Sequence, residues 1–385
     1  MTKRLLAFNY FFFAWILTHA QLYNPNINKE LDKIDRSVSY VRSFENLGIK
    51  SVNSTESYKT VEWLKSEYAS FGYDSIRIDS FVKGTRTYRN VVVTKQGSGD
   101  EYILVCGHFD TRNGPGANDN GSGIAAILET ARILEPLSTN RTVLFVNFDG
   151  EEEGYTGSQY YVDNQLSFLN NKLYMVMNID QIGGTRGVTG NDKIKCERDE
   201  YNDPISNNAL SWLVTDTLTQ LAEAYTSLTP VVSQAFSSDY IPFEAEGVVI
   251  TGLYQNAQDK YSHRPSDTLG NMDTTSLKQA VRLTAAATIH FAQVARFVST
   301  PEVDLASDIV VYPNPANDIL NFTLENPNNN LKISVLSVTG KVVLTRELSA
   351  SNTSVSIGHL ETGSYVIELA VDTGQKMYKR LIINR

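Results

Sequence analysis

Apolar residues follow two alternating patterns between residues 102 and 253. Short continuous apolar runs, bounded by polar and turn-forming residues, predict buried strands at 102–108, 142–148, 173–180 and 248–253. Apolar positions at helical spacing predict helices between them, at 119–135, 157–165 and 207–226. Because strands and helices alternate, this region favours a largely parallel sheet with helices on both faces.

The flanking segments extend this pattern on both sides. Helical spacing marks residues 28–47 and 55–71, and strand-like runs follow at 75–82 and 90–94. A long apolar helix is predicted at 274–297, where it can pack against the sheet. The predicted fold class is therefore α/β, a three-layer sandwich with a largely parallel mixed sheet between helices.

The composition changes near residue 299, where a Ser, Thr and Pro-containing segment at 299–307 predicts a linker. After it, short β-rich runs are separated by Pro, Asn, Gly and Asp turns at roughly ten-residue spacing. The runs are 309–312, 319–324, 332–337, 342–348, 354–357, 364–371 and 376–383. They predict a small all-β sandwich over 308–385, separate from a larger domain at 21–298.

The first twenty residues have the features of a secretory signal peptide. Lys3 and Arg4 precede an apolar core at 5–17, and Thr18-His-Ala20 is a small-x-small cleavage site. The core is shorter than the ~20 apolar residues that a spanning helix needs. The sequence therefore predicts an exported protein with a signal peptide at 1–20 and no membrane span.

Composition narrows the class of partner and the role of the cysteines. The chain has 385 residues, 42% of them hydrophobic, and a formal net charge of −9. Without a basic stripe to meet phosphates, nucleic acid is excluded as a partner. Two cysteines, Cys106 and Cys196, cannot form a disulfide framework. Since Cys106 lies inside an apolar strand, a buried free thiol is favoured over a disulfide.

Candidate metal ligands stand where the predicted strands end. Imidazole and carboxylate groups hold zinc, and open α/β folds place their sites at the carboxyl edge of the sheet. Two ions about 3.5–4 Å apart can there share a carboxylate and a water. The candidates are His108, Asp110, Asp119 in a Gly-rich loop, Glu151, Glu152, Glu153, Asp180 and His263.

Each candidate also has an ordinary structural interpretation. Asp119 can be a helix N-cap, and three adjacent glutamates are most often a solvated charge run. His290 lies in an apolar helix and is interpreted as structural, which leaves His108 and His263 as the histidines in polar loops after strands. No single signal decides between these interpretations, whereas their ordered combination favours a two-metal site.

That combination resembles a known family over about residues 25–298. The matching segments are Gly-His108-Phe-Asp110-Thr, Gly-Ala-Asn-Asp119-Asn-Gly-Ser-Gly, Glu151-Glu152-Glu153-Gly-Tyr-Thr-Gly-Ser, Asn-Ile-Asp180, Ser238-Asp239-Tyr240 and His263-Arg-Pro-Ser-Asp267-Thr. They resemble the co-catalytic zinc exopeptidases typified by secreted bacterial leucyl aminopeptidases, with glutamate carboxypeptidase II as a distant relative.

The resemblance implies a pair of zinc ions and a role for each ligand. Asp119 would bridge the two ions. His108 and Asp180 would complete one zinc, and Glu152 and His263 would complete the other.

The resemblance also implies the residues that act beside the metals. Glu151 would be the general base that takes a proton from the bridging water, and Asp110 would orient His108. The family often has histidine where this chain has Tyr240, and this phenol is a candidate donor to an oxyanion.

The implied activity is removal of N-terminal residues from peptides or proteins outside the cell. Carboxypeptidase or dipeptidase action on the same site stays open, as does a single-zinc glutaminyl cyclase on the same fold. A binding module on this fold would have lost ligands, and all five are present here. The preferred side chain is open, with Tyr254, Tyr261 and Phe243 as candidates for the pocket lining.

The tail carries a second resemblance. Its segments Val311-Tyr-Pro-Asn-Pro-Ala-Asn-Asp-Ile-Leu, Val335-Leu-Ser-Val-Thr-Gly-Lys, Leu360-Glu-Thr-Gly-Ser-Tyr and Lys379-Arg-Leu-Ile resemble the carboxy-terminal sorting domain of the type IX secretion system of Bacteroidetes. This implies the secretion machinery as a partner, and export through the periplasm to the medium or the cell surface. The alternative is a carbohydrate-binding or spacer sandwich, although the tail has no tryptophan as a stacking platform.

Overall fold

The computed structural model describes residues 23–169, 172–200, 204–205, 207–294, 309–314, 316–324, 331–337, 342–348, 353–371 and 376–384. The chain divides into two compact units, Met1–Arg296 and Phe297–Arg385. The predicted signal peptide at 1–20 and linker at 299–307 lie outside the described residues. The proposed domain limits at 21–298 and 308–385 stay predictions.

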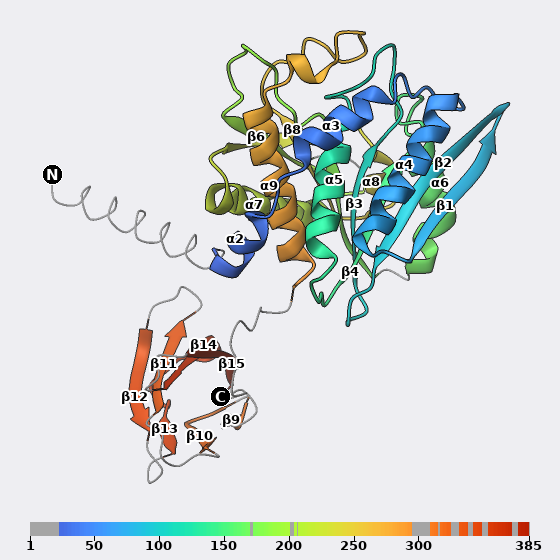
Figure 1. Ribbon diagram of the computed structural model, residues 1–385. Helices are drawn as coiled ribbons and strands as arrows, with labels where there is room; N and C mark the ends of the chain where they lie inside the picture. The colour runs from blue at the N-terminus through green and yellow to red at the C-terminus, as the bar shows by residue number, and fades with distance from the viewer. Residues whose placement is uncertain are drawn as a thin grey trace. The chain divides into compact units, whose positions relative to one another are not determined.

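The first unit contains an eight-stranded mixed sheet (Figure 1). Its strands are β1 (Ile76–Lys83), β2 (Arg86–Lys95), β3 (Tyr102–His108), β4 (Thr142–Phe148), β5 (Leu173–Ile179), β6 (Lys193–Arg198), β7 (Thr229–Gln234) and β8 (Ile250–Gln255). The order is β1-β2-β4-β3-β5-β8-β6-β7. The central strands β4, β3, β5 and β8 are parallel, whereas β2 and β6 run antiparallel to β4 and β8. The carboxyl ends of the central strands therefore meet at one edge.

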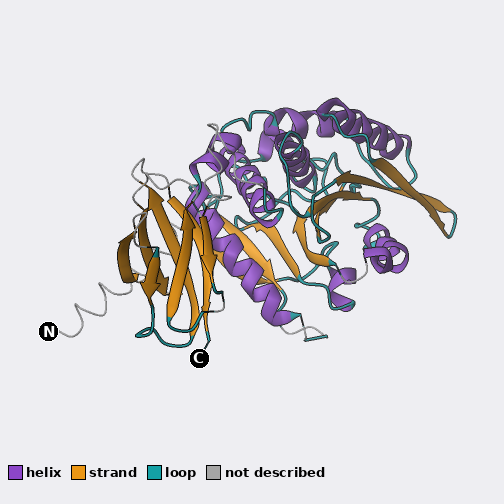
Figure 2. Cartoon of the chain, turned by 90° about the horizontal axis from the view of Figure 1, so that it is seen from below, coloured by secondary structure: helices purple, strands orange, loops and turns teal. Residues whose placement is uncertain are grey.

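Helices cover the sheet on both faces, and Figure 2 shows them around it. They are α2 (Pro25–Leu31), α3 (Ser37–Asn46), α4 (Thr55–Phe71), α5 (Gly121–Leu134), α6 (Thr156–Gln165), α7 (Asn208–Tyr225), α8 (Ile241–Ala245) and α9 (Thr274–Phe291). Helices α5 and α9 lie side by side (Figure 1). Within the described part of the chain, no helix has the length and apolar character needed to cross a membrane.

The alternation of side chains along the strands builds two core layers. Leu104 and Cys106 of β3 pack in one buried cluster with Tyr161 of α6 and Phe243 of α8. The intervening residues of β3 point to the opposite face, where α5 contacts the strand. Because both faces are covered, the central strands are largely apolar, and charged residues begin where the strands end.

The second unit has two antiparallel sheets. One has the order β13-β10-β9 and the other β12-β11-β14-β15. A single buried cluster contains Leu320 and Phe322 from the first sheet with Ile333 and Ile367 from the second, so the unit is a small sandwich. The bounds are β9 (Ile309–Tyr312), β10 (Ile319–Leu324), β11 (Leu331–Ser337), β12 (Val342–Leu348), β13 (Ser354–Ser356), β14 (Gly363–Val371) and β15 (Lys376–Ile383).

The structure confirms the predicted fold class, and it corrects several elements. The helix predicted at 28–47 is wrong, because α2 ends at Leu31 and α3 begins at Ser37. Between them the backbone N–H groups of Asp35 and Arg36 donate to the buried carboxylate of Glu129, at 2.8 and 2.5 Å. This tertiary contact competes with helix hydrogen bonds. The final helix ends at Phe291, before the predicted limit of 297.

Two strands and one short helix were absent from the sequence prediction. β6 and β7 lie at the end of the sheet and are rich in polar residues, so they lack an apolar run. One face of β6 lines a cavity instead of the apolar core, which explains the polar side chains of this strand. The helix α8 has five residues, too short to show a periodic pattern.

Candidate metal centre

Four loops bring the candidate ligands to the carboxyl edge of the central strands. His108 is the last residue of β3, and Asp180 follows β5 directly. Asp119 lies just before α5, and Glu152 lies in the turn after β4. His263 comes from the loop after β8. Parallel strands thus place side chains from distant parts of the sequence at one point.

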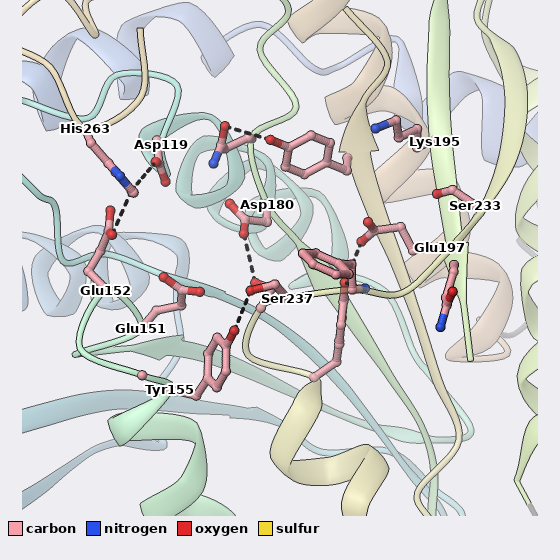
Figure 3. Close-up of a pocket in the computed structure, with 17 residues that line it drawn as sticks. Asp119, Glu151, Glu152, Tyr155, Asp180, Lys195, Glu197, Ser233, Ser237 and His263 are labelled. Carbon is pink, nitrogen blue, oxygen red and sulfur yellow. Dashed lines mark hydrogen bonds and ion pairs between the residues drawn. The ribbon is translucent and has the colours of Figure 1, made fainter. Parts of the chain in front are cut away.

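The five residues form two groups that share one carboxylate. In the first group, His108 Nε2 lies 3.4 Å from both Asp119 Oδ1 and Asp180 Oδ1. In the second group, His263 Nε2 lies 3.4 Å from Asp119 Oδ2 and 2.8 Å from Glu152 Oε2 (Figure 3). Each oxygen of Asp119 therefore faces a different group, as expected of a bridging ligand.

The chemistry of the two groups fits a bound cation. Asp119 Oδ2, Asp180 Oδ1 and Glu152 Oε1 are buried and accept no hydrogen bond from the described residues. Burial raises the pKa of Glu152 to about 8. Buried carboxylates without donors are costly, and a divalent cation offsets their mutual repulsion. Imidazole and carboxylate ligands suit zinc, although the ligand roles of these five residues stay predictions.

Asp110 links the first group to the acidic turn. Its carboxylate accepts hydrogen bonds from the backbone N–H groups of Glu151 at 3.0 Å and Glu152 at 3.2 Å. His108 Nδ1 lies 3.1 Å from the Asp110 carbonyl oxygen and 3.5 Å from its Oδ1. One carboxylate therefore fixes the turn that carries two candidate residues, a contact that the sequence pattern did not indicate.

Two further residues position the ligand carboxylates. The carboxylate of Asp267 accepts from the backbone N–H groups of Asn118 at 2.8 Å and Asp119 at 3.0 Å. Ser238 Oγ donates to Asp180 Oδ2 at 2.8 Å. Both residues lie in segments that carried the family resemblance, yet sequence reasoning gave neither one a role.

The three consecutive glutamates point in different directions. Glu151 Oε2 lies 4.0 Å from His108 Nε2, and burial raises the pKa of Glu151 to about 10. Glu152 faces His263 in the second group. Glu153 points away from the site, where it pairs with Arg86 and accepts from the Tyr88 hydroxyl at 2.7 Å. The turn thus directs one carboxylate toward His108, one toward His263 and one away from the site.

A cavity of about 620 Å³ opens beside the two groups. Tyr254 lines it, as the sequence suggested, but Tyr261 is not among the lining residues. The suggestion for Phe243 is wrong, since its ring is fully buried among the apolar residues under α6 and α8. The Tyr240 hydroxyl donates to Glu197 Oε2 at 3.1 Å. In this structure its proton is therefore used in that hydrogen bond and not directed to the oxyanion that the sequence suggested.

A fully buried lysine fixes the loop that leads to Asp119. Lys50 Nζ donates to the carbonyl oxygens of Phe44 at 2.9 Å, Gly48 at 2.6 Å and Pro115 at 2.7 Å. Burial lowers the pKa of Lys50 to about 7. The three carbonyl acceptors favour the charged form of Lys50, because only the ammonium form offers three donors.

The predicted free thiols Cys106 and Cys196 are both buried and unpaired in the described structure.

Comparison with known proteins identifies the first unit. Residues 90–288, a little over half of the chain, match Peptidase family M28. The chain belongs to peptidase family M28. An aminopeptidase of Pseudomonas aeruginosa is 32% identical over 188 residues, which cover 47% of this chain and 33% of that protein. This M28 chain therefore spans about a third of the length of that relative.

Solved structures support the M28 fold. The Legionella pneumophila LapA aminopeptidase superposes with a TM-score of 0.61 at 19% identity, over 71% of this chain and 76% of that one. A Porphyromonas gingivalis glutaminyl cyclase superposes with a TM-score of 0.56 at 19% identity, over 67% of this chain and 98% of that one. At 19% identity, the likeness to these two structures shows a shared fold alone.

The second unit of this M28 protein matches a different family. Residues 310–384 match the Secretion system C-terminal sorting domain. The match covers the described sandwich from β9 to β15, so the sorting domain and the all-β unit are the same segment.

Lys50→Met tests the buried lysine. We expect a loss of about 3 kcal/mol or more of unfolding free energy, because three buried carbonyl oxygens lose their donors. Zinc retention should also fall, since Pro115 leads directly to Asp119. Thermal unfolding and metal analysis measure the two effects. The matched control is Lys59→Met at an exposed position of α4, with an expected change within about 0.5 kcal/mol. Equal stability of the two variants would contradict this role.

Proposed function

We propose that this M28 family protein is an exported aminopeptidase that holds two zinc ions. The observation that carries the proposal is the shared carboxylate of Asp119, whose two oxygens face separate ligand groups. His108 and Asp180 would hold one ion with Asp119, and Glu152 and His263 the other. Zinc bound at these groups supplies Lewis acidity, which polarises a carbonyl and lowers the pKa of water.

Glu151 is the general base in this proposal. Its carboxylate lines the cavity beside the ligands, and its backbone is fixed by Asp110. From this place it would accept a proton from the attacking water and deliver it to the leaving amine. Because Asp110 holds the backbone rather than the side chain, Glu151 keeps the freedom that proton transfer requires.

The cluster of carboxylates supports action at the amino terminus. Glu151, Glu152 and Asp180 all line the cavity, and an ammonium group would meet their negative charge there. The relative from Pseudomonas aeruginosa is an aminopeptidase, which supports the same substrate end. Carboxypeptidase or dipeptidase action is the alternative on the same site.

A glutaminyl cyclase is the second candidate, favoured by the similar fold of the Porphyromonas gingivalis enzyme. Metal analysis of the purified protein separates the two proposals. Two zinc ions per chain favour the aminopeptidase, whereas one zinc with cyclisation of N-terminal glutamine favours the cyclase. Hydrolysis of aminoacyl substrates without cyclisation would decide for the peptidase.

Acetylation of the substrate tests the proposed amino-terminal action. An acetylated α-amine is uncharged and cannot pair with the carboxylates of the cavity, so turnover should be abolished. The measurement compares kcat/KM for one peptide in its free and acetylated forms. Equal hydrolysis of both would refute aminopeptidase action, and it would leave the proposed metal site standing.

Single Gln substitutions test the three glutamates. Glu151→Gln should retain both zinc ions and lose about 10²–10⁴ in kcat, the contribution of a general base. Glu152→Gln should weaken one ion and make activity depend on added zinc. Glu153→Gln is the matched control and should change kcat little, since its side chain points away to Arg86.

Metal analysis of each variant, together with its kinetics, tests which role Glu151 and Glu152 have. If Glu151→Gln lost an ion while Glu152→Gln kept both and lost turnover, the roles would be exchanged by one position.

We propose that the sorting domain directs the protein through the type IX machinery. The match of residues 310–384 supports this route, and the predicted signal peptide would supply the first step into the periplasm. The final location, in the medium or on the cell surface, is part of the proposal.

Truncation after residue 300 tests the tail. The first compact unit ends at Arg296, so the shortened protein should fold and keep its kcat/KM. It should fail to leave the native host, as measured by activity in medium and cell fractions. A soluble, folded truncation without activity would argue against independent units, and unchanged export would argue against a sorting role.

A further inference from the structure

The cavity extends from the metal ligands to a lysine on β6. Lys195 and Glu197 are two positions apart on this strand, so both side chains leave the same face and line the cavity. Lys195 is the register partner of Tyr254 on β8. Figure 3 shows Lys195 at the side of the cavity away from His263 and Glu152, with its nitrogen directed inward.

Lys195 forms no close ion pair among the described residues, although the neighbouring carboxylate of Glu197 acts on it electrostatically. The contact of Lys195 is with the ring of Tyr254, whose centroid lies 5.1 Å from Nζ. Arg198 on the same strand differs, because it pairs with Glu200 at 3.0 Å, on the other side of the strand. An ammonium group that faces a cavity and has no carboxylate within hydrogen-bond distance favours an anionic ligand.

Glu197 is the nearest charged competitor for Lys195. Its Oε2 accepts the hydroxyl proton of Tyr240, and the residue is 7% exposed. Burial raises the pKa of Glu197 to about 7, which weakens it as an anion near neutral pH. The Glu197 carboxylate is thus engaged by Tyr240, whereas the Lys195 ammonium is free to meet a substrate in the cavity.

The remaining wall contains uncharged polar residues and aromatic rings. Ser233, Gln234, Gln181 and Phe236 line it together with the Tyr254 ring, and the carboxylates other than Glu197 lie at the metal side. The cavity thus has negative groups suited to an α-amine at one side and a positive group at the other.

We propose that Lys195 binds a carboxylate of the substrate and is the specificity-determining residue of this site. The inference rests on the proposed aminopeptidase function. The carboxylate can be the side chain of an N-terminal Asp or Glu residue, or the α-carboxylate of a dipeptide. Both place an anion at a fixed distance from a free amine, and the same lysine meets either one.

Binding measurements on the full-length, zinc-loaded protein test this inference without relying on turnover. A Glu151→Gln background slows hydrolysis of the ligands. The first ligand pair is glutamic acid α-amide and glutamine amide, which differ in the side-chain carboxylate. The second pair is leucyl-glycine and leucyl-glycinamide, which differ in the α-carboxylate. Calorimetric titration gives the Kd of each ligand.

We expect the carboxylate form of one pair to bind at least about tenfold more tightly than its amide. The pair that shows the preference identifies the source of the carboxylate. Adding Lys195→Gln should abolish the preference, and adding Lys193→Gln should preserve it. Lys193 is an exposed lysine on the same strand and outside this cavity, so it controls for lost charge.

The inference is overturned if neither pair shows a preference, or if the preference survives Lys195→Gln. Tighter binding of lysine amide than of glutamic acid α-amide would also overturn it, since Glu197 would then set the specificity. Separately, wild-type protein that binds carboxylate ligands through Lys195 but cleaves no aminoacyl substrate would refute the proposed hydrolysis and leave this subsite intact.

Discussion

The sharing of Asp119 between two ligand groups is the constraint on which the rest of the site depends. Carboxylates gathered in a buried place repel one another, and several of their oxygens accept no hydrogen bond from the described residues. The fold fixes them through hydrogen bonds behind the site: the backbone N–H groups of Glu151 and Asp119 donate to the carboxylates of Asp110 and Asp267, and the Ser238 hydroxyl donates to Asp180. These contacts orient the remaining oxygens toward the two groups, where divalent cations would lower the energy of the cluster.

The central sheet makes this arrangement rigid. His108 and Asp180 leave neighbouring parallel strands, so their separation is set by the spacing of strands rather than by flexible loops. The apolar layers on both faces, with α5 on one and α6 on the other, keep those strands in register. The more exposed side of the centre is formed by His263, 44% of whose side chain is accessible. A rigid side and an accessible side together suit a site that must hold ions and admit a substrate.

Sequence reasoning was most successful where burial makes the pattern local. An apolar run that stops at His108 predicts both a strand and the position where it ends, and the same holds for the run before Asp180. It failed where a contact joins distant positions. The break between α2 and α3 depends on Glu129, some ninety residues away, and the support from Asp267 comes from 148 residues beyond Asp119. β6 was missed because Lys195 and Glu197 face a cavity rather than the core.

The loop before α5 is held from both ends of the first unit. Lys50, from the amino-terminal side of the unit, donates a hydrogen bond to the carbonyl oxygen of Pro115. Asp267, from the carboxyl-terminal side, accepts hydrogen bonds from the backbone N–H groups of Asn118 and Asp119. Contacts of such high sequence separation form late, after the entropy of closing long loops has been overcome. A chain that has folded only through β5 would carry His108, Asp119 and Asp180 without Asp267, which fixes this loop from the carboxyl-terminal side. The candidate metal centre therefore needs contacts from both ends of the unit, so a partly synthesised chain lacks a complete ligand set and the contacts that order it.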